Sequence, residues 1–221
     1  MVGAVCVAFV AGVRSSGGAE SAAQRRTWTL RAAVGSAAAL GLTAAVISSG
    51  ALRILEPVPL VILYFAGSNL FAIALALSPV GKRLAGGLSL ALLLGFQGFR
   101  VPLEVVLHSW YSQGSLPVQM TWEGQNLDII SGLLGLGYAL LAARSTLPRS
   151  AAWAANSVGL LLLLNVMRIA VTSGPLPMLR TFMNHPPLLL VCYLPYGWIV
   201  PFCVSAALFA HLMTVRKLLD R

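Results

Sequence analysis

Long apolar runs separated by short polar segments dominate this chain and leave few ways for it to fold. A helix that crosses a hydrocarbon core needs roughly 20 consecutive apolar residues. The runs that we expect to be helical are 2–13, 32–52, 58–77, 84–111, 127–143, 151–172 and 188–215. Because the first run is shorter than the others, the sequence predicts an all-α, polytopic transmembrane bundle of six or seven spans, formed as one domain over residues 1–221.

The composition excludes the common alternatives to a membrane bundle. Hydrophobic residues make up 58% of the chain and charged residues only 10%, whereas a soluble domain carries about a quarter charged residues. The mean hydropathy is +0.84. The 21 glycines and 12 prolines lie largely inside or beside the apolar runs, which also excludes a coiled coil or a disordered chain.

Proline and chain position make three of the runs irregular. Pro102 is expected to kink the run 84–111, and Pro195 and Pro201 interrupt the first half of the last run. The run 2–13 has the length of a signal-peptide core. We favour a short first helix, or a start site placed too far downstream, because no basic residue follows Met1 and no clear cleavage site precedes the first arginine.

The basic residues predict the orientation of the bundle. The chain has 15 Lys and Arg against 6 Asp and Glu, and basic residues accumulate in cytoplasmic loops. Alternate loops and the chain end hold eleven of them: Arg14, Arg25, Arg26, Arg31, Lys82, Arg83, Arg144, Arg149, Arg216, Lys217 and Arg221. The remaining loops hold Arg53 and Arg180. We therefore expect a cell-membrane protein with a cytoplasmic C-terminus and external loops at 108–126 and 173–187. No basic face is left for nucleic acid.

Arg100 and Arg168 lie inside apolar runs, so the orientation of the loops does not explain them. Arg100 begins a polar stripe. Arg100, Glu104 and His108 recur at every fourth position, so a regular helix places them on one face. A charge near the bilayer centre costs at least about 2.5 kcal/mol, and such residues normally find partners inside the bundle. One interpretation is a buried Arg100–Glu104 ion pair that fixes helix packing. The other is a functional site.

Further polar residues are expected at a similar depth, in the outer half of the membrane. Asn165 and Arg168 lie one turn apart, although Arg168 is close enough to the outer end to reach the interface alone. Asn156, nearer the inner end, is expected to serve helix packing. The candidate ligand-binding or proton-relay residues are Arg100, Glu104, His108, Glu123, Asn126, Asp128, Asn165 and Arg168.

No cofactor is expected from the motifs. His108 and His211 are separated by nearly the full bilayer, which disfavours a bis-His haem. Lys82 and Lys217 lie at helix ends, which disfavours a retinal Schiff base, and no glycine-rich nucleotide motif is present. A metal held by His108, His185 and Glu104 (or Glu123) at the outer surface is a weak alternative. The cysteines suggest small apolar residues rather than a zinc or disulfide framework; they are Cys6, Cys192 and Cys203.

Four stretches carry a resemblance to known sequences. They are GFRVPLEVVLH (98–108), PVQMTWEGQNLDIISGL (117–133), WAANSVGLLLLLNV (153–166) and LPYGWIVPFCVSAALFAHL (194–212). Together they resemble a widespread, uncharacterised family of bacterial multi-pass membrane proteins, and the part within Met120–Ile129 is the most specific. The resemblance implies a helical integral membrane protein and brings no substrate or catalytic residue.

Three functions are consistent with these residues. The first is binding or transport of a small anionic or amphiphilic ligand, with Arg100 and Arg168 holding its polar group and Glu104 and His108 relaying protons. The second is an accessory subunit in which the polar residues are packing contacts, which implies a membrane-protein partner or a second copy. The third is a membrane-embedded enzyme acting on a lipid or isoprenoid headgroup, with Glu104 or His108 as general base. The bilayer is a partner in all three.

Overall fold

The computed structural model describes residues 1–18, 20–56, 59–182 and 187–220. Every regular element in these residues is helical, so the predicted all-α fold is confirmed. The α-helices are α1 (Val2–Ser15), α2 (Ala22–Ser48), α3 (Leu60–Leu77), α4 (Pro79–Gly87), α5 (Leu90–Gly95), α6 (Arg100–Ser112), α7 (Ile129–Ala142), α8 (Arg149–Thr172) and α9 (Ser205–Leu219). The 3₁₀ turns are η1 (Ala51–Arg53), η2 (Phe96–Phe99), η3 (Val118–Met120), η4 (Leu190–Cys192) and η5 (Tyr196–Trp198), and η6 (Val200–Val204) is π-helical.

Five helical segments within the described residues are long and apolar enough to cross a membrane. They are Ala22–Ser48, Leu60–Leu77, Leu90–Ser112, Arg149–Thr172 and Tyr196–Leu219. The helices α1 and α7 are apolar but shorter.

The predicted run 84–111 is divided between α4 and a separate helical segment, Leu90–Ser112, which consists of α5, η2 and α6. Residues 84–87 belong to α4, which starts with a proline and packs against α1 and α9. Leu88 is extended, with φ −95° and ψ 147°, and the hydroxyl of Ser89 accepts the N–H of Leu92 at 3.2 Å. The long helix therefore begins at Leu90, because Ser89 caps a new N-terminus.

The helix α2 also differs from its predicted range, 32–52. It begins ten residues earlier, at Ala22, because Ser21 and Gln24 form a reciprocal capping box. It ends at Ser48, and Gly50 then adopts a left-handed φ of +77° that reverses the chain.

Proline shapes the last membrane segment, as the sequence predicts, but its regular helix starts later than residue 188. The chain first makes the turns η4 and η5, and it enters α9 through the π-helical stretch around Pro201. A proline nitrogen cannot donate a helical hydrogen bond. The carbonyl of Gly197, four residues before Pro201, instead accepts the hydroxyl of Tyr64 at 3.1 Å, and the carbonyl of Val200 accepts both the backbone N–H and the hydroxyl of Ser205.

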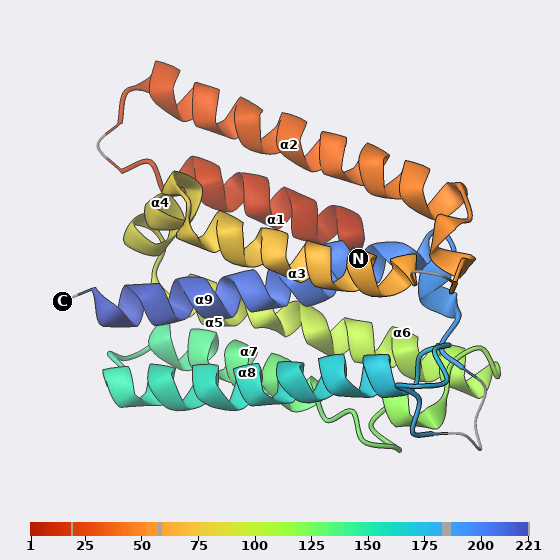
Figure 1. Ribbon diagram of the computed structural model, residues 1–221. Helices are drawn as coiled ribbons and strands as arrows, with labels where there is room; N and C mark the ends of the chain where they lie inside the picture. The colour runs from red at the N-terminus through yellow and green to blue at the C-terminus, as the bar shows by residue number, and fades with distance from the viewer. Residues whose placement is uncertain (19, 57–58, 183–186, 221) are drawn as a thin grey trace.

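The helices run roughly side by side along one direction, with α9 inside the bundle and α2 on its edge (Figure 1). Of the most apolar 18 residues of Tyr196–Leu219, 56% are buried inside the molecule. The corresponding share for Ala22–Ser48 is 6%. Packing against α3, α4, α5 and α8 makes α9 the central helix.

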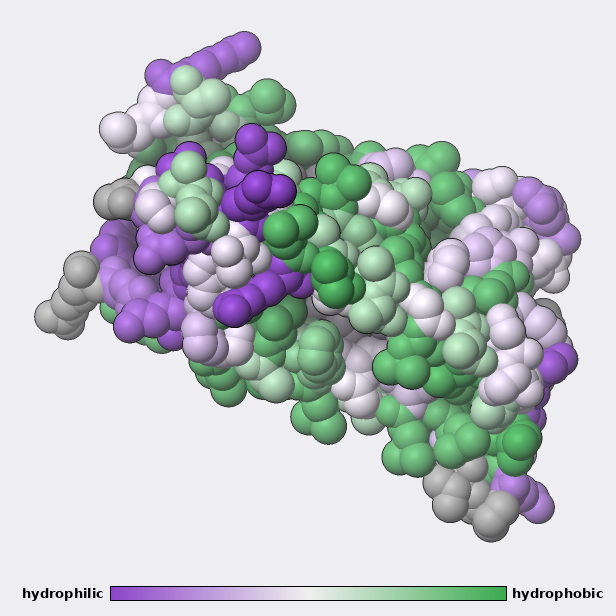
Figure 2. Space-filling view, turned by 90° about the horizontal axis from the view of Figure 1, so that it is seen from above, coloured by the Kyte–Doolittle hydropathy of each residue, from purple (hydrophilic) through white to green (hydrophobic). Residues whose placement is uncertain are grey.

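The basic segments meet at one end of the bundle. The start of α2, the helix α4, the connection between α7 and α8, and the end of α9 all lie at the left of Figure 1. Figure 2 shows hydrophilic residues gathered at this end and a mostly hydrophobic surface over the middle of the molecule. The end of α6 and the end of α8 lie at the opposite end.

Candidate functional site

The guanidinium of Arg100 is buried at the start of α6 and pairs with a carboxylate from another helix. Arg100 is 1% exposed, and its Nη1 donates to Oδ1 of Asp128 at 2.8 Å and to the carbonyl oxygen of Gly159 at 3.2 Å. The interpretation as an Arg100–Glu104 ion pair is therefore wrong. Asp128 directly precedes the first turn of α7, where the helix dipole also stabilises a negative charge.

The carboxylate of Glu104 is held by an amide instead of a guanidinium. Nδ2 of Asn126 donates to Oε1 and Oε2 of Glu104 at 2.8 and 2.9 Å, and it lies 3.0 Å from the carbonyl oxygen of Met120. Oδ1 of Asn126 accepts the backbone N–H of Asp128 at 3.0 Å. A single buried amide thus joins α6, the turn η3 and the start of α7.

Gly159 is the point where α8 approaches these groups. Besides Arg100, the hydroxyl of Ser131 lies 3.4 Å from the Gly159 carbonyl oxygen and 3.1 Å from Oδ1 of Asp128, so it can donate to either. A Cβ at position 159 would lie 2.7 Å from Cε1 of His211. Only a glycine lets the His211 ring approach α8 this closely, and Nδ1 of that ring lies 2.9 Å from Oδ1 of Asn156.

These contacts define a buried polar cluster that links α6, α7, α8 and α9. We use this name for Arg100, Glu104, Asn126, Asp128, Ser131, Asn156, Gly159 and His211. Four of the eight predicted site residues belong to it: Arg100, Glu104, Asn126 and Asp128. The packing role expected for Asn156 is its contact with His211.

His108 and Glu123 lie outside the buried polar cluster, near the end of α6. Nε2 of His108 is 3.6 Å from Oε1 of Glu123, and the imidazole stacks on Trp122 with ring centroids 4.2 Å apart. The His108 side chain is 29% exposed and that of Glu123 50%. The stripe predicted from sequence spacing therefore divides into a buried part and a partly exposed part.

Arg168 and Asn165 also lie outside the cluster. Nη2 of Arg168 donates to Oδ1 of Asn165 at 2.9 Å and to Oε1 of Gln125 at 3.0 Å, while Nδ2 of Asn165 donates to the Gln125 carbonyl at 2.8 Å. Arg168 is exposed. These bonds fasten the segment between α6 and α7 to the outside of α8, so the two arginines proposed to hold one anionic group have separate environments.

The metal alternative is only partly covered by the structure. His185 lies outside the described residues. Within the part of the chain that the structure describes, no three His, Cys, Asp or Glu side chains converge on a common point.

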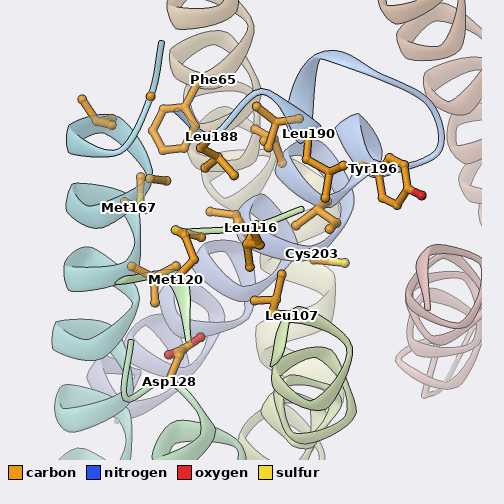
Figure 3. A pocket seen from close by; sticks show the side chains of 18 of the residues that line it. Phe65, Leu107, Leu116, Met120, Asp128, Met167, Leu188, Leu190, Tyr196 and Cys203 are labelled. Atoms are coloured by element: carbon orange, nitrogen blue, oxygen red, sulfur yellow. The ribbon is translucent and has the colours of Figure 1, made fainter. Parts of the chain in front are cut away.

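An apolar cavity of about 170 Å³ lies beside the buried polar cluster. Its lining extends from Arg100 at the start of α6 to Trp110 near the end of that helix, so it occupies the half of the bundle away from the basic end. Apolar side chains surround it, and Figure 3 shows Asp128 at the bottom of the view. The charged residues in the lining are Arg100, Glu104 and Asp128. For comparison, an apolar cavity of about 150 Å³ can hold benzene.

Sequence reasoning missed several residues of this site. Ser131, Gly159 and His211 were not among the candidates, and neither was Gln97, whose Nε2 donates to the Ala207 carbonyl at 3.2 Å. One sequence signal could have found Gly159: it lies three residues after Asn156, so a helix places both on one face. The partners on α7 and α9 required the tertiary structure.

Fold and site together define an all-helical protein with membrane-length apolar helices and a buried polar cluster beside an apolar cavity. Residues 57–219 match the family described as domain of unknown function (DUF8737). Because the match covers more than half of the chain, the protein belongs to this family. No curated protein and no solved structure matches the chain.

Proposed function

We propose that this is a multi-pass protein of the cell membrane whose basic end faces the cytoplasm. The gathering of basic segments at one end of the bundle (Figure 1) supports this orientation, since basic loops stay on the cytoplasmic side. The C-terminus is then cytoplasmic, and the loops 108–126 and 173–187 are external. A green fluorescent protein fused after the last residue should fluoresce, and alkaline phosphatase fused there should be inactive. The opposite pattern would reverse the orientation.

The two short apolar helices lie in the membrane with the five long ones, which gives seven spans. Each has 14 residues, or about 21 Å at 1.5 Å per residue. Packing of α7 against α5 and α8, and of α1 against α2 and α4, keeps both helices within the bundle. A short span is tolerated where neighbouring helices cover it, at a modest mismatch cost.

The biochemical function that we propose is binding or transport of a small amphiphilic ligand from the external half of the membrane. The observation that carries this proposal is the apolar cavity with three charged residues in its wall. Ligand sites are concave and mostly apolar, with a few polar groups that orient the ligand. Charged groups within a membrane are costly and usually functional.

A cavity-filling substitution tests the proposal with n-octanol as the probe. Met167 lines the cavity from α8, so Met167→Trp should abolish octanol binding measured by calorimetry on the protein in lipid nanodiscs. Protein-free nanodiscs correct for partition into lipid. The matched control is Leu161→Trp on the same helix, where the side chain is 66% exposed and binding should be unchanged. Equal binding by wild type and Met167→Trp would place the ligand elsewhere.

The second candidate is an accessory subunit, and the closed hydrogen-bonding around Asn126 favours it. This amide is 0% exposed and satisfies Glu104, Met120 and Asp128 at once, as expected of a purely structural contact. An accessory subunit predicts no saturable octanol binding to the wild-type protein. It also predicts co-purification with a stoichiometric membrane-protein partner.

A further inference from the structure

The carboxylate of Glu104 is buried, and no cationic side chain of the described residues forms an ion pair with it. Glu104 is 1% exposed, and its two oxygens accept hydrogen bonds from Asn126. Arg100 lies one turn away on the same helix, but its guanidinium forms an ion pair with Asp128. None of the ion pairs formed between described residues includes Glu104.

The groups around Glu104 do not balance its charge. Arg100 contributes one positive charge and Asp128 one negative charge, so an ionised Glu104 leaves the cluster with a net charge of −1. Other elements place further titratable groups in the cavity wall or the cluster, and none of them forms an ion pair with Glu104 among the described residues: the Tyr64 hydroxyl of α3, the Tyr196 hydroxyl of η5, the Cys203 thiol of η6 and the His211 imidazole of α9. Nearer the end of α6, the imidazole of His108 lies beside the carboxylate of Glu123.

An uncompensated charge in this place is expensive, and two species can remove it. Taking an ion out of water is costly unless a partner compensates its charge. A proton on Glu104 neutralises the carboxylate. A cationic group of a ligand in the cavity would neutralise it equally well.

The cavity wall contains donors as well as acceptors, because Arg100 lines it together with Glu104 and Asp128. Nε and Nη2 of Arg100 are enclosed by protein, without a hydrogen-bond partner among the described residues. The Arg100 side chain is 1% exposed, whereas that of Asp128 is 6% exposed and lies at the bottom of the close-up in Figure 3. Glu104 is as buried as Arg100, at 1% exposed, so the charge of a preferred ligand follows from the charge balance of the cluster.

We infer that the cavity binds apolar ammonium ions and that each bound ion displaces the proton of Glu104. The inference rests on the proposed ligand-binding function, and it assigns a positive charge to the polar group of the ligand. The exchange balances: the carboxylic acid of Glu104 and an alkylammonium ion give a carboxylate–ammonium pair, and one proton is released to water. An anionic ligand would add to the negative charge of the cluster.

Calorimetry with three probes of equal chain length tests the inference. The protein in lipid nanodiscs is titrated near neutral pH with n-octylammonium, n-octanol and n-octanoate, and protein-free nanodiscs provide the blank. Repeating the titrations in phosphate and in Tris, whose ionisation enthalpies differ, counts the protons released on binding. We expect octylammonium to bind at least about tenfold more tightly than octanol, with release of about one proton per ligand.

Two variants separate Glu104 from other carboxylates. Glu104→Gln should lose both the preference for octylammonium over octanol and the proton release. The control is Glu123→Gln, which changes an exposed carboxylate beside His108 and should leave both quantities unchanged. The proton count on wild type needs no variant, so it tests the inference even where Glu104→Gln fails to fold.

The outcomes distinguish this inference from the proposed function. Tighter binding of octanoate than of octylammonium would overturn the inference, as would octylammonium binding without proton release. Retention of the octylammonium preference in a folded Glu104→Gln variant would overturn it as well. In each of these cases ligand binding itself stands. If none of the three probes binds, the proposed function fails together with the inference.

Discussion

Removing one member of the Arg100–Asp128 ion pair should lower the stability of the protein far more than replacing both members by apolar residues. Nη1 and Oδ1 are 2.8 Å apart, and the two residues are 1% and 4% exposed. Among the described residues, the guanidinium in Asp128→Leu keeps a hydrogen bond to the Gly159 carbonyl alone. In Arg100→Met the side chain of Asp128 keeps, within the same residues, a hydrogen bond to the Ser131 hydroxyl alone. The double variant removes both charges and fills the space with apolar side chains.

The size of the effect follows from burial. Removing one member of a buried ion pair costs about 3–5 kcal/mol, because the other charge stays buried and uncompensated. Replacing both members by apolar residues is often neutral or stabilising. Each single variant should therefore be destabilised by about 3–5 kcal/mol, and the double variant by at least about 2 kcal/mol less than the sum of the two.

The assay is equilibrium unfolding in mixed micelles by titration with sodium dodecyl sulfate, followed by circular dichroism and tryptophan fluorescence. Arg168→Met is the matched control. Its guanidinium is exposed and bonded to neutral amides, so the loss should stay within about 1 kcal/mol. Costs of the single variants that add within about 0.5 kcal/mol would refute the reasoning. Single variants no less stable than Arg168→Met would refute it too.

Two further substitutions test local contacts by the stability they remove. Gly159→Ala should destabilise the bundle by about 1–3 kcal/mol in the same unfolding assay, because the new Cβ would lie 2.7 Å from Cε1 of His211. Gly137→Ala, on α7 with no neighbouring heavy atom within 4 Å, should be neutral or stabilising by up to about 1 kcal/mol, and an equal loss in both would contradict the steric argument. Ser21→Ala removes the capping box of α2 and should weaken its first turn by about 0.5–2 kcal/mol. Amide hydrogen exchange should then rise there and not in α8; unchanged exchange would show that the cap is dispensable.

Helices whose ends coincide with a change in polarity could be predicted closely from the sequence. The runs 127–143 and 151–172 correspond to Ile129–Ala142 and Arg149–Thr172. An apolar stretch that must avoid water becomes a helix of nearly that length, because a helix satisfies its own backbone hydrogen bonds.

Ends set by capping or by backbone conformation were predicted poorly. The break before Leu90 falls inside an apolar run and depends on one serine, Ser89. The start of α2 depends on Ser21 and Gln24, which lie in a polar stretch that hydropathy assigns to a loop. A cap stabilises a helix end through one or two hydrogen bonds, so it leaves little trace in the average polarity of a run.

The sequence by itself determined that the chain forms apolar helices and that Arg100, Glu104 and Asp128 had to find places within or beside them. Only the tertiary structure decided their partners. Spacing along a helix shows which residues share a face, and on that basis Glu104 was the natural partner of Arg100. The packing of α6 against α7 instead brings Asp128, 28 positions away, into contact with the guanidinium. Glu104 is left to an amide at the edge of an apolar cavity, because ion-pair geometry depends on how whole helices meet.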